Sequence, residues 1–210
     1  MKNLFTKNRV LYLITDRTIS GLTHTEIVKK AIDADIRVIQ LREKNMSGRE
    51  LYKEALSVRR LTMRYRTTFI INDYIDIALA VNADGVHLGQ KDMPIKEARK
   101  ILGNRKIIGI STHSLKQAVD AQRAGADYIG FGPIFKTTTK NAGSPKGIES
   151  LIEIKKHIKI PIVAIGGITA ENAFLALKAG ADAVAVVSGV LKGDIKTNTR
   201  KFLSIIRNVK

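Results

Sequence analysis

Five charged residues lie at places in the sequence where their side chains can be expected to converge. Arg42 and Lys44 follow one short apolar run, Asp73 and Asp92 follow the next two, and Lys140 lies in a later loop. Cations and carboxylates that converge without cancelling suggest a phosphate chain held with a divalent ion, because carboxylate and phosphate oxygens are hard ligands for Mg²⁺. The alternative is that Arg42 or Lys44 pairs with Asp73 in a salt bridge.

Two glycine-containing turns and a threonine-rich loop offer groups for a second phosphate. Gly166-Gly167 and Val187-Ser188-Gly189 provide backbone N–H groups and close approach, and Thr137 to Thr139 add hydroxyl donors. The glycines taken alone are weak evidence, since a turn can require Gly for its positive φ. The sequence therefore suggests two phosphate-bearing ligands, a diphosphate with Mg²⁺ and a monophosphate.

The histidines give no sign of a nucleophilic triad or a zinc site. His87 alternates within an apolar run, which favours a hydrogen-bonded interior residue over a general base, and His113 is expected to begin a helix. Neither fits a Ser/His/Asp arrangement or the H-E-x-x-H spacing. The chain has no Cys, which excludes a disulfide scaffold, a thiolate nucleophile and a Cys-based metal site.

The elements that must position these residues alternate along the whole chain. Short β-branched runs predict strands at 10–15, 38–42, 68–72, 85–88, 107–111, 128–132, 162–165 and 183–187. Amphipathic segments predict helices at 25–34, 47–65, 74–81, 94–102, 114–124, 148–157, 169–179 and 195–206. This order is typical of βα units around a parallel sheet.

Residues at the predicted helix ends support this order. The expected N-terminal caps are Thr23 or Thr25, Ser47, Ser114 and Thr169, with Pro94 at a first helical position and glycines 103, 125 and 180 at helix ends. The segments 124–127 and 179–182 both read Ala-Gly-Ala-Asp, and 81–84 is a looser third copy. We interpret them as one recurring helix-to-strand turn.

Eight such units in 210 residues predict an α/β fold, a compact (β/α)₈ TIM barrel that spans 1–210 as a single domain. A doubly wound open sheet is the alternative, but residues 16–21 do not supply a G-x-G-x-x-G turn after the first strand. The long unpatterned stretch 136–146 is interpreted as an active-site loop. A barrel enzyme builds its site from the loops after the strands, where the charged residues fall.

The charge balance is strongly basic, with 36 Lys and Arg against 19 Asp and Glu and a formal net charge of +17. We expect no nucleic-acid partner, because these residues are dispersed, aromatic residues make up 5% and Trp is absent. No apolar run approaches the roughly 20 residues of a membrane span, and residues 1–9 lack the pattern of a signal peptide. A cytoplasmic protein without a membrane partner is therefore expected, with homo-oligomerisation left open.

Six segments, taken in chain order, carry a resemblance that covers almost the whole chain. They are 40–44, 71–73, 85–92, 132–135 with the following 137–140, 164–168 and 185–188. Together they resemble the thiamine phosphate synthase family. The resemblance implies a Mg²⁺-dependent (β/α)₈ barrel that joins 4-amino-2-methyl-5-hydroxymethylpyrimidine diphosphate to a thiazole phosphate, in many organisms its carboxylated form. The implied products are thiamine phosphate and diphosphate.

The resemblance also implies a role for individual positions. The implied pyrimidine diphosphate contacts are Gln40, Leu41, Arg42, Glu43, Lys44, Asn72, Ser111 and Lys140. The implied Mg²⁺ ligands are Asp73 and Asp92. The implied thiazole phosphate contacts are Thr137, Thr138, Thr139, Gly167, Val187 and Ser188. Within these sets, the implied catalytic residues are Arg42, Lys44, Lys140 and Ser111.

The chemistry of the family agrees with the residue types. In the family, the C–O bond to diphosphate breaks early and the thiazole nitrogen captures the resulting pyrimidine-methyl cation. Such a reaction needs stabilisation of the leaving group and two aligned substrates, and little acid–base chemistry. This explains a site with cations, carboxylates and glycine turns but no nucleophile.

Two other functions remain as alternatives. The thiazole tautomerase is a similar barrel that has a His where this chain has Pro133 and lacks the paired aspartates, whereas Asp73 and Asp92 are retained here. A barrel that binds thiamine intermediates without turning them over is the second, and the retained diphosphate and Mg²⁺ residues argue against it.

Three positions have no assigned consequence. Lys91 stands where the family commonly has an acidic residue, and Lys136 stands where it commonly has Pro. Either change could alter Mg²⁺ affinity or loop closure. Glu43 has no expected role beyond orienting Arg42 or Lys44.

Overall fold

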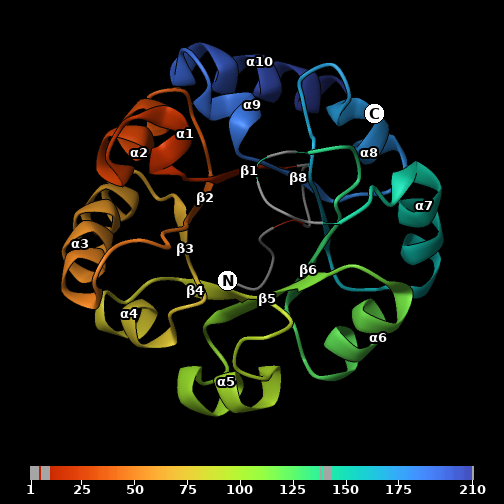
Figure 1. Cartoon of the computed structure of the whole chain (residues 1–210), viewed down its shortest axis with the longest axis horizontal. Helices are drawn as coiled ribbons and strands as arrows, with labels where there is room; N and C mark the ends of the chain where they lie inside the picture. Colours follow the sequence, from red (N-terminus) through yellow and green to blue (C-terminus); the bar gives the residue numbers. More distant parts are fainter. Residues whose placement is uncertain (1–4, 6–9, 138, 140–142, 210) are drawn as a thin grey trace.

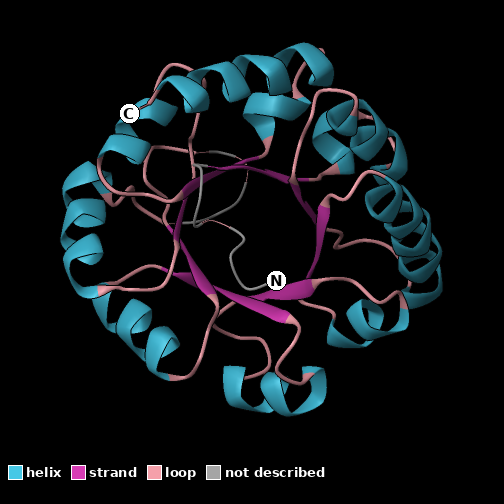
Figure 2. Ribbon diagram, turned by 180° about the vertical axis from the view of Figure 1, so that it is seen from behind, coloured by secondary structure: helices cyan, strands magenta, loops and turns pink. Residues whose placement is uncertain are grey.

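Eight strands close into a parallel barrel in the computed structural model, which describes residues 5, 10–137, 139 and 143–209. The strands are β1 (Val10–Ile14), β2 (Val38–Leu41), β3 (Thr68–Asn72), β4 (Gly85–Leu88), β5 (Ile107–Thr112), β6 (Tyr128–Phe131), β7 (Ile162–Ile165) and β8 (Ala183–Val186). Each strand pairs with the next, and β1 also pairs with β8, which closes the ring shown in Figure 2. The predicted (β/α)₈ barrel is confirmed, and the open sheet is excluded.

Helices surround this ring and return the chain from one strand to the next (Figure 1). The described residues form α1 (Arg17–Ser20), α2 (His24–Ile32), α3 (Gly48–Arg64), α4 (Ile75–Ala80), α5 (Ile95–Leu102), α6 (Leu115–Arg123), α7 (Gly147–His157), α8 (Ala173–Lys178), α9 (Ser188–Leu191) and α10 (Ile195–Asn208). Each predicted helix is present. The four-residue helices α1 and α9 were not predicted, because a single turn shows no amphipathic period.

The helix starts follow the capping chemistry at most of the predicted places. Side chains cap the first turn at Thr23, Ser47 and Ser114, as predicted. The predicted start at Thr169 is wrong: α8 begins later, after Asn172, whose Oδ1 accepts from the Thr169 N–H at 2.8 Å. Pro94 precedes the first residue of α5 instead of occupying it. His113 likewise precedes α6 and its cap.

Apolar side chains form an outer and an inner core, as the alternation of residues along each strand requires. The outer core lies between strands and helices and contains Ile39 and Phe69. The inner core fills the barrel and contains Tyr12 and Ile70, with Phe5 packed against it. The barrel interior is therefore packed and carries several polar tips, among them the hydroxyl of Tyr12.

The three repeated segments that end in aspartate make one recurring contact between neighbouring strands. Each aspartate precedes an even-numbered strand and accepts a hydrogen bond from a backbone N–H of the preceding strand. The bonds run from Phe69 to Asp84, from Ile108 to Asp127 and from Ile162 to Asp182, each at 2.8 Å. A basic side chain pairs with each carboxylate, respectively Arg59, Arg99 and Lys155. The aspartate of each repeat thus ties the start of its strand to the preceding strand.

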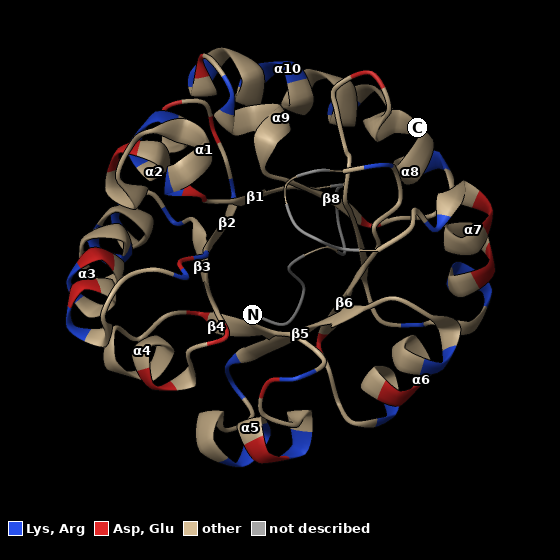
Figure 3. Cartoon of the chain, viewed as in Figure 1, with Lys and Arg blue, Asp and Glu red and all other residues tan. Residues whose placement is uncertain are grey.

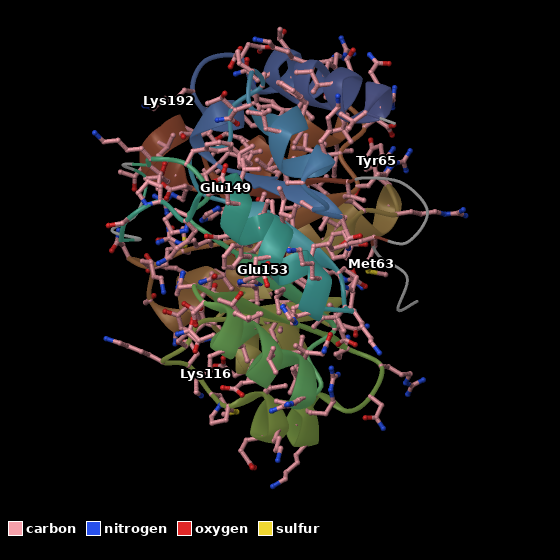
Figure 4. The ribbon with its side chains drawn as sticks, turned by 90° about the vertical axis from the view of Figure 1, so that its right-hand side faces the viewer. Met63, Tyr65, Lys116, Glu149, Glu153 and Lys192 are labelled. Carbon is pink, nitrogen blue, oxygen red and sulfur yellow. The ribbon has the colours of Figure 1, made fainter. Side chains whose placement is uncertain are left out.

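The two ends of the barrel carry different connections. Figure 4 shows Met63 and Tyr65, at the end of α3, on one side of the molecule, and Lys116, near the start of α6, and Lys192, after α9, on the other. The helices therefore run back against the strands. The loops that follow the strands gather at the end marked by Lys116 and Lys192.

The charged residues lie around the whole ring of helices, with Lys and Arg mixed among Asp and Glu (Figure 3). This is the dispersed arrangement expected from the sequence. Among the described residues, no helix combines the length and apolar character needed to cross a membrane.

Candidate active site

A pocket opens at the end of the barrel where the strands finish. All eight strands contribute to its lining, through Ile14, Gln40, Asn72, His87, Ser111, Gly130, Ile165 and Ala185. The space in the pocket and in front of its open mouth amounts to about 1110 Å³. This is room for ligands of metabolite size.

Most of the predicted ligand contacts meet in this pocket. The predicted residues in its lining are Gln40, Arg42, Asn72, Ser111, Thr137, Thr139, Gly167, Val187 and Ser188. The side chain of Leu41 is buried in the outer core instead. Glu43, Lys44, Asp73 and Asp92 lie outside the lining. Thr138 and Lys140 lie outside the described residues.

Gln40 and Ser111 are held from inside the barrel. Gln40 Nε2 donates to the Tyr12 hydroxyl at 2.9 Å, and Ser111 Oγ lies 2.9 Å from His87 Nε2. Gln90 Nε2 donates to the backbone carbonyl of Ser111 at 2.7 Å. His87 is therefore a hydrogen-bonded interior residue, as expected from its alternation.

Arg42 and Lys44 each have a carboxylate partner. Arg42 Nη1 lies 3.2 Å from Asp16 Oδ2, and Lys44 Nζ pairs with Asp73 Oδ2. The salt bridge between Lys44 and Asp73 that the sequence left open is thus present. Lys44 is about half exposed, so this pair exchanges readily with solvent and adds little stability.

The carboxylates of Asp73 and Asp92 follow neighbouring strands, β3 and β4. Asp73 has a positive φ of 64°, and its N–H donates to the His87 carbonyl at 2.9 Å, so the backbone is fixed there. Asp92 Oδ2 accepts from the Gly89 N–H at 2.6 Å, which closes a tight turn. Within the described part of the chain, no group of three His, Cys, Asp or Glu side chains gathers into a metal site.

Glu43 acts on the backbone of the turn that carries Lys44. Glu43 Oε1 accepts from the N–H groups of Lys44 at 2.7 Å and Asn45 at 2.8 Å, and Oε2 lies 3.2 Å from His24 Nε2. Burial raises the pKa of Glu43, but the bonds from Asn45, Lys44 and His24 outweigh it and leave that pKa below its ordinary value. Burial lowers the pKa of His24 in spite of the neighbouring carboxylate.

The opposite side of the pocket is built from turns after β7 and β8. Gly167 has a φ of 66°, and Asn172 Nδ2 donates to its carbonyl at 2.9 Å. Ser188 begins α9, and the Thr139 hydroxyl lies 3.4 Å from its Oγ. The Thr139 N–H donates to Thr137 Oγ1 at 3.3 Å. Hydroxyl and backbone groups thus face one part of the pocket, which suits a phosphate.

Comparison with known proteins identifies the family. The model of a family described as thiamine monophosphate synthase matches residues 11–190, which is nearly all of the barrel. The chain belongs to the thiamine monophosphate synthase family. The resemblance drawn from the six sequence segments is confirmed.

Individual members of the thiamine monophosphate synthase family match over almost their full lengths. The thiamine-phosphate synthase of Clostridium novyi is 50% identical over 201 residues, which cover 95% of this chain and 98% of the relative. That of Chloroflexus aurantiacus is 48% identical and covers 95% of this chain and 93% of the relative. The solved thiamine phosphate pyrophosphorylase from Pyrococcus furiosus superimposes with a TM-score of 0.91 at 41% identity and covers 99% of both chains.

This member of the thiamine monophosphate synthase family also has pocket residues that the sequence did not reveal. His113 lines the pocket and places Nδ1 2.6 Å from the Gly132 carbonyl. Pro133 lines it after a cis peptide bond with Gly132. Ile14 and Ile165 add apolar surface. Their position as the last residues of β1 and β7 was the signal that could have found the two isoleucines, since strand ends line the mouth of a barrel.

Proposed function

We propose that the protein is a thiamine phosphate synthase, a transferase that condenses a pyrimidine-methyl diphosphate with a thiazole phosphate. The bond between the pyrimidine methylene carbon and the diphosphate oxygen breaks, and a bond from the thiazole nitrogen to that carbon forms. Thiamine phosphate and free diphosphate are the products. The observation that carries the proposal is that one pocket gathers residues from both predicted ligand sets, in a chain about half identical to proteins named for this activity.

The proposed diphosphate end of the pocket lies near β2 and β3. Arg42 lines the pocket there, and Lys44 lies on the next turn of the loop. Their present partners are carboxylates. The Lys44 side chain is about half exposed, so a diphosphate can replace Asp73 there at small cost, whereas the Arg42–Asp16 pair is more shielded and holds Arg42 in place. Lys140 completes the proposed cation set from the loop after β6. Fixed cations stabilise a departing diphosphate most when they are positioned before the reaction begins.

The pyrimidine ring is proposed to lie deeper, against Gln40, Asn72 and Ser111. These residues lie at or next to the ends of β2, β3 and β5, and all line the pocket. Leu41 contributes only through its backbone in this proposal, because its side chain belongs to the outer core. The thiazole phosphate is proposed to bind the turns at Gly167 and at residues 187–188, together with residues 137–139.

A divalent cation fits the donor set. Asp73 and Asp92 supply carboxylate oxygens from neighbouring strands, and Asp92 keeps one oxygen outside its bond to Gly89. Mg²⁺ retains several waters and is commonly held by one or two carboxylates plus substrate phosphate, so a closed cage of three protein side chains is not needed. When bound, Mg²⁺ supplies charge stabilisation to the leaving diphosphate. Lys44 and Asp73 are proposed to separate as the diphosphate enters.

The substrates in this proposal are small molecules, and the reaction is proposed to take place in the cytoplasm. No nucleic acid or membrane takes part in it.

The direct test is formation of thiamine phosphate from both purified substrates, measured as thiochrome fluorescence after oxidation. Product is expected with Mg²⁺ and not with EDTA, and Mg²⁺ added in excess should restore it. Lys140→Ala and Asp92→Ala are expected to abolish turnover while circular dichroism stays unchanged. Asp120→Ala is the matched control, because Asp120 lies on α6 and pairs only with the exposed Lys116 among the described contacts.

Metal-independent product would refute the role of Asp73 and Asp92. Near-normal turnover of Lys140→Ala or Asp92→Ala would refute the role of that residue. Absence of product from a folded protein that binds both substrates would refute the proposed reaction and favour a binding-only barrel.

A further inference from the structure

An unbroken chain of hydrogen bonds crosses the inside of the barrel beneath the pocket. Gln40 Nε2 donates to the Tyr12 hydroxyl at 2.9 Å, and that hydroxyl lies 2.8 Å from the Tyr128 hydroxyl. The Tyr128 hydroxyl lies 2.9 Å from His87 Nδ1, and His87 Nε2 lies 2.9 Å from Ser111 Oγ. The five side chains come from β2, β1, β6, β4 and β5. Only the two ends, Gln40 and Ser111, have a proposed contact with substrate.

The three middle side chains of this hydrogen-bond series, Tyr12, Tyr128 and His87, are shielded from water. Tyr12 and Tyr128 are each 1% exposed, and His87 is 9% exposed. The Phe5 ring packs on both tyrosine rings, with centroids 6.4 Å and 5.4 Å away. Burial raises the pKa of both tyrosines far above neutrality. Each hydroxyl therefore keeps its single proton. Within the series of five hydrogen-bonded side chains, it accepts one hydrogen bond and donates one.

Gly109 and Gly130 leave the space that the hydrogen-bonded side chains of Tyr128 and His87 occupy. His87, Gly109 and Tyr128 are in register across β4, β5 and β6. A Cβ atom on Gly109 would lie 2.0 Å from Tyr128 Cζ, and a Cβ atom on Gly130 would lie 3.2 Å from His87 Cε1. The Tyr128 ring thus lies over Gly109 and reaches His87 because that strand position has no side chain.

The donor-to-acceptor direction of these hydrogen bonds is set at Gln40 and carried through to Ser111. A tyrosine hydroxyl can accept two hydrogen bonds but has only one proton, so the direction depends on where that proton can go. The Tyr12 hydroxyl accepts from Gln40, and among the described residues its other hydrogen-bond partner is the Tyr128 hydroxyl, so Tyr12 donates to Tyr128 and Tyr128 donates to His87 Nδ1. His87 then carries its proton on Nε2 and donates to Ser111. This leaves two groups unused by the chain, the carbonyl oxygen of Gln40 as an acceptor and the hydroxyl proton of Ser111 as a donor.

We propose that Tyr12, Tyr128 and His87 are positioning residues that set the hydrogen-bonding polarity of the pocket, with an acceptor at Gln40 and a donor at Ser111. The inference rests on the proposed function, in which an aminopyrimidine ring lies between these two residues. That ring offers an amino donor at one edge and a ring-nitrogen acceptor at another, which is the complement of the pocket. A 4-oxo pyrimidine offers a carbonyl acceptor in place of the amino donor and meets the wrong polarity at Gln40.

The test compares the pyrimidine diphosphate substrate with its 4-oxo analogue. Dissociation constants are measured by calorimetry, and kcat/KM is measured where product forms, for the wild-type protein, Tyr12→Phe and Tyr128→Phe. The wild type is expected to prefer the amino compound strongly, because a site built to hydrogen-bond a group rejects an analogue that lacks it. Each tyrosine variant breaks the chain, frees Gln40 to turn, and is expected to lower this preference about tenfold.

Thr199→Val is the matched control. Thr199 carries another fully buried hydroxyl, bonded to the Ile195 carbonyl on α10 and remote from the pocket. Its loss is expected to lower stability without changing the preference. A tyrosine variant that weakens both ligands equally would show a merely structural role and overturn the proposal. A wild type that binds neither ligand, or binds both equally, would overturn it as well.

Binding and turnover separate this inference from the proposed reaction. If the wild type prefers the amino compound in calorimetry but forms no product, the proposed function fails, and the tyrosine variants still test the polarity. A second measurement needs no variant: nitrogen-15 spectra of the labelled wild type report the tautomer of His87. A proton on Nε2 is expected, and a proton on Nδ1 would reverse the chain and overturn the proposal.

Discussion

The turn at Gly167 offers a sharp test of how the backbone shapes the phosphate end of the pocket. Gly167 has a φ of 66°, and an added Cβ atom would lie 2.4 Å from the Lys136 carbonyl oxygen and 2.8 Å from Phe135 Cβ. Gly167→Ala therefore imposes a left-handed conformation on an L residue and also forces the turn away from the loop that follows β6. Gly21→Ala is the matched control, because Gly21 has a φ of 69° and open space around its Cβ position.

The expected magnitudes follow from these two geometries. The left-handed conformation costs about 1–2 kcal/mol, and the lower entropy of the unfolded alanine variant returns about 0.4–1 kcal/mol. The overlap with residues 135–136 adds about 1–3 kcal/mol. Gly21→Ala should thus lower the free energy of unfolding by about 1 kcal/mol and Gly167→Ala by about 2–4 kcal/mol. The difference between the variants isolates the overlap.

Urea unfolding measures both free energies, and steady-state kinetics then measures the KM for the thiazole phosphate. Because the displaced segment leads directly into Thr137, we expect Gly167→Ala to raise this KM about tenfold and Gly21→Ala to leave it unchanged. Equal stability losses in the two variants would refute the overlap argument. An unchanged KM in a clearly destabilised Gly167→Ala protein would refute the placement of the phosphate at this turn.

Three further predictions concern the remaining polar contacts. Asp127→Ala leaves the buried Ile108 N–H without its acceptor and should lower the free energy of unfolding by about 2–3 kcal/mol in urea; a loss below about 0.5 kcal/mol would contradict this. Burial lowers the folded-state pKa of His24, so the unfolded chain takes up the proton first and stability falls as the pH drops below about 6.5; His24→Gln should flatten this decline in thermal unfolding, and an unchanged slope would contradict it. Glu43→Ala frees the backbone of Lys44 and should raise the KM for the pyrimidine diphosphate several-fold with little change in kcat, whereas a pure loss of kcat would contradict the positioning role.

The sequence predicted the strands well because their signal is local. Each of the eight predicted strands agrees with the structure to within a residue or two, since most are short apolar runs rich in β-branched residues with polar residues, Gly or Pro on either side. The short helix α1 was missed, although Asp16 caps it and Gly21 ends it with a left-handed turn. These two residues were a usable signal. The start of α8 was misplaced because Thr169 and Asn172 both suit a cap, and only the tertiary structure selects between them.

The sequence predicted which residues at strand ends line the candidate site. It did not predict which interior side chains hydrogen-bond to them. Gln40, Asn72 and Ser111 meet in one pocket because barrel strands all end at one mouth. The pairing of Gln40 with Tyr12 and of Ser111 with His87 depends on which interior side chains cross the barrel axis. Packing across the barrel decides which side chains meet there. These contacts join residues far apart in the sequence and produce no repeating pattern along it, so the sequence alone did not predict them.

The pocket combines two kinds of recognition that differ in how firmly they are set before substrate arrives. At the mouth, Lys44 and Asp73 form a partly exposed ion pair, which water and salt weaken, so a diphosphate can exchange with the carboxylate at little cost. Inside the barrel, Tyr12 and Tyr128 are shut off from water, where an unpaired polar group is costly, so their bonds must be complete in the empty protein. Charge at the mouth can therefore rearrange around phosphate, while the interior holds a fixed donor and acceptor for a neutral ring. This division predicts that added salt weakens diphosphate binding and leaves the preference between amino and oxo rings unchanged, because only the mouth is screened.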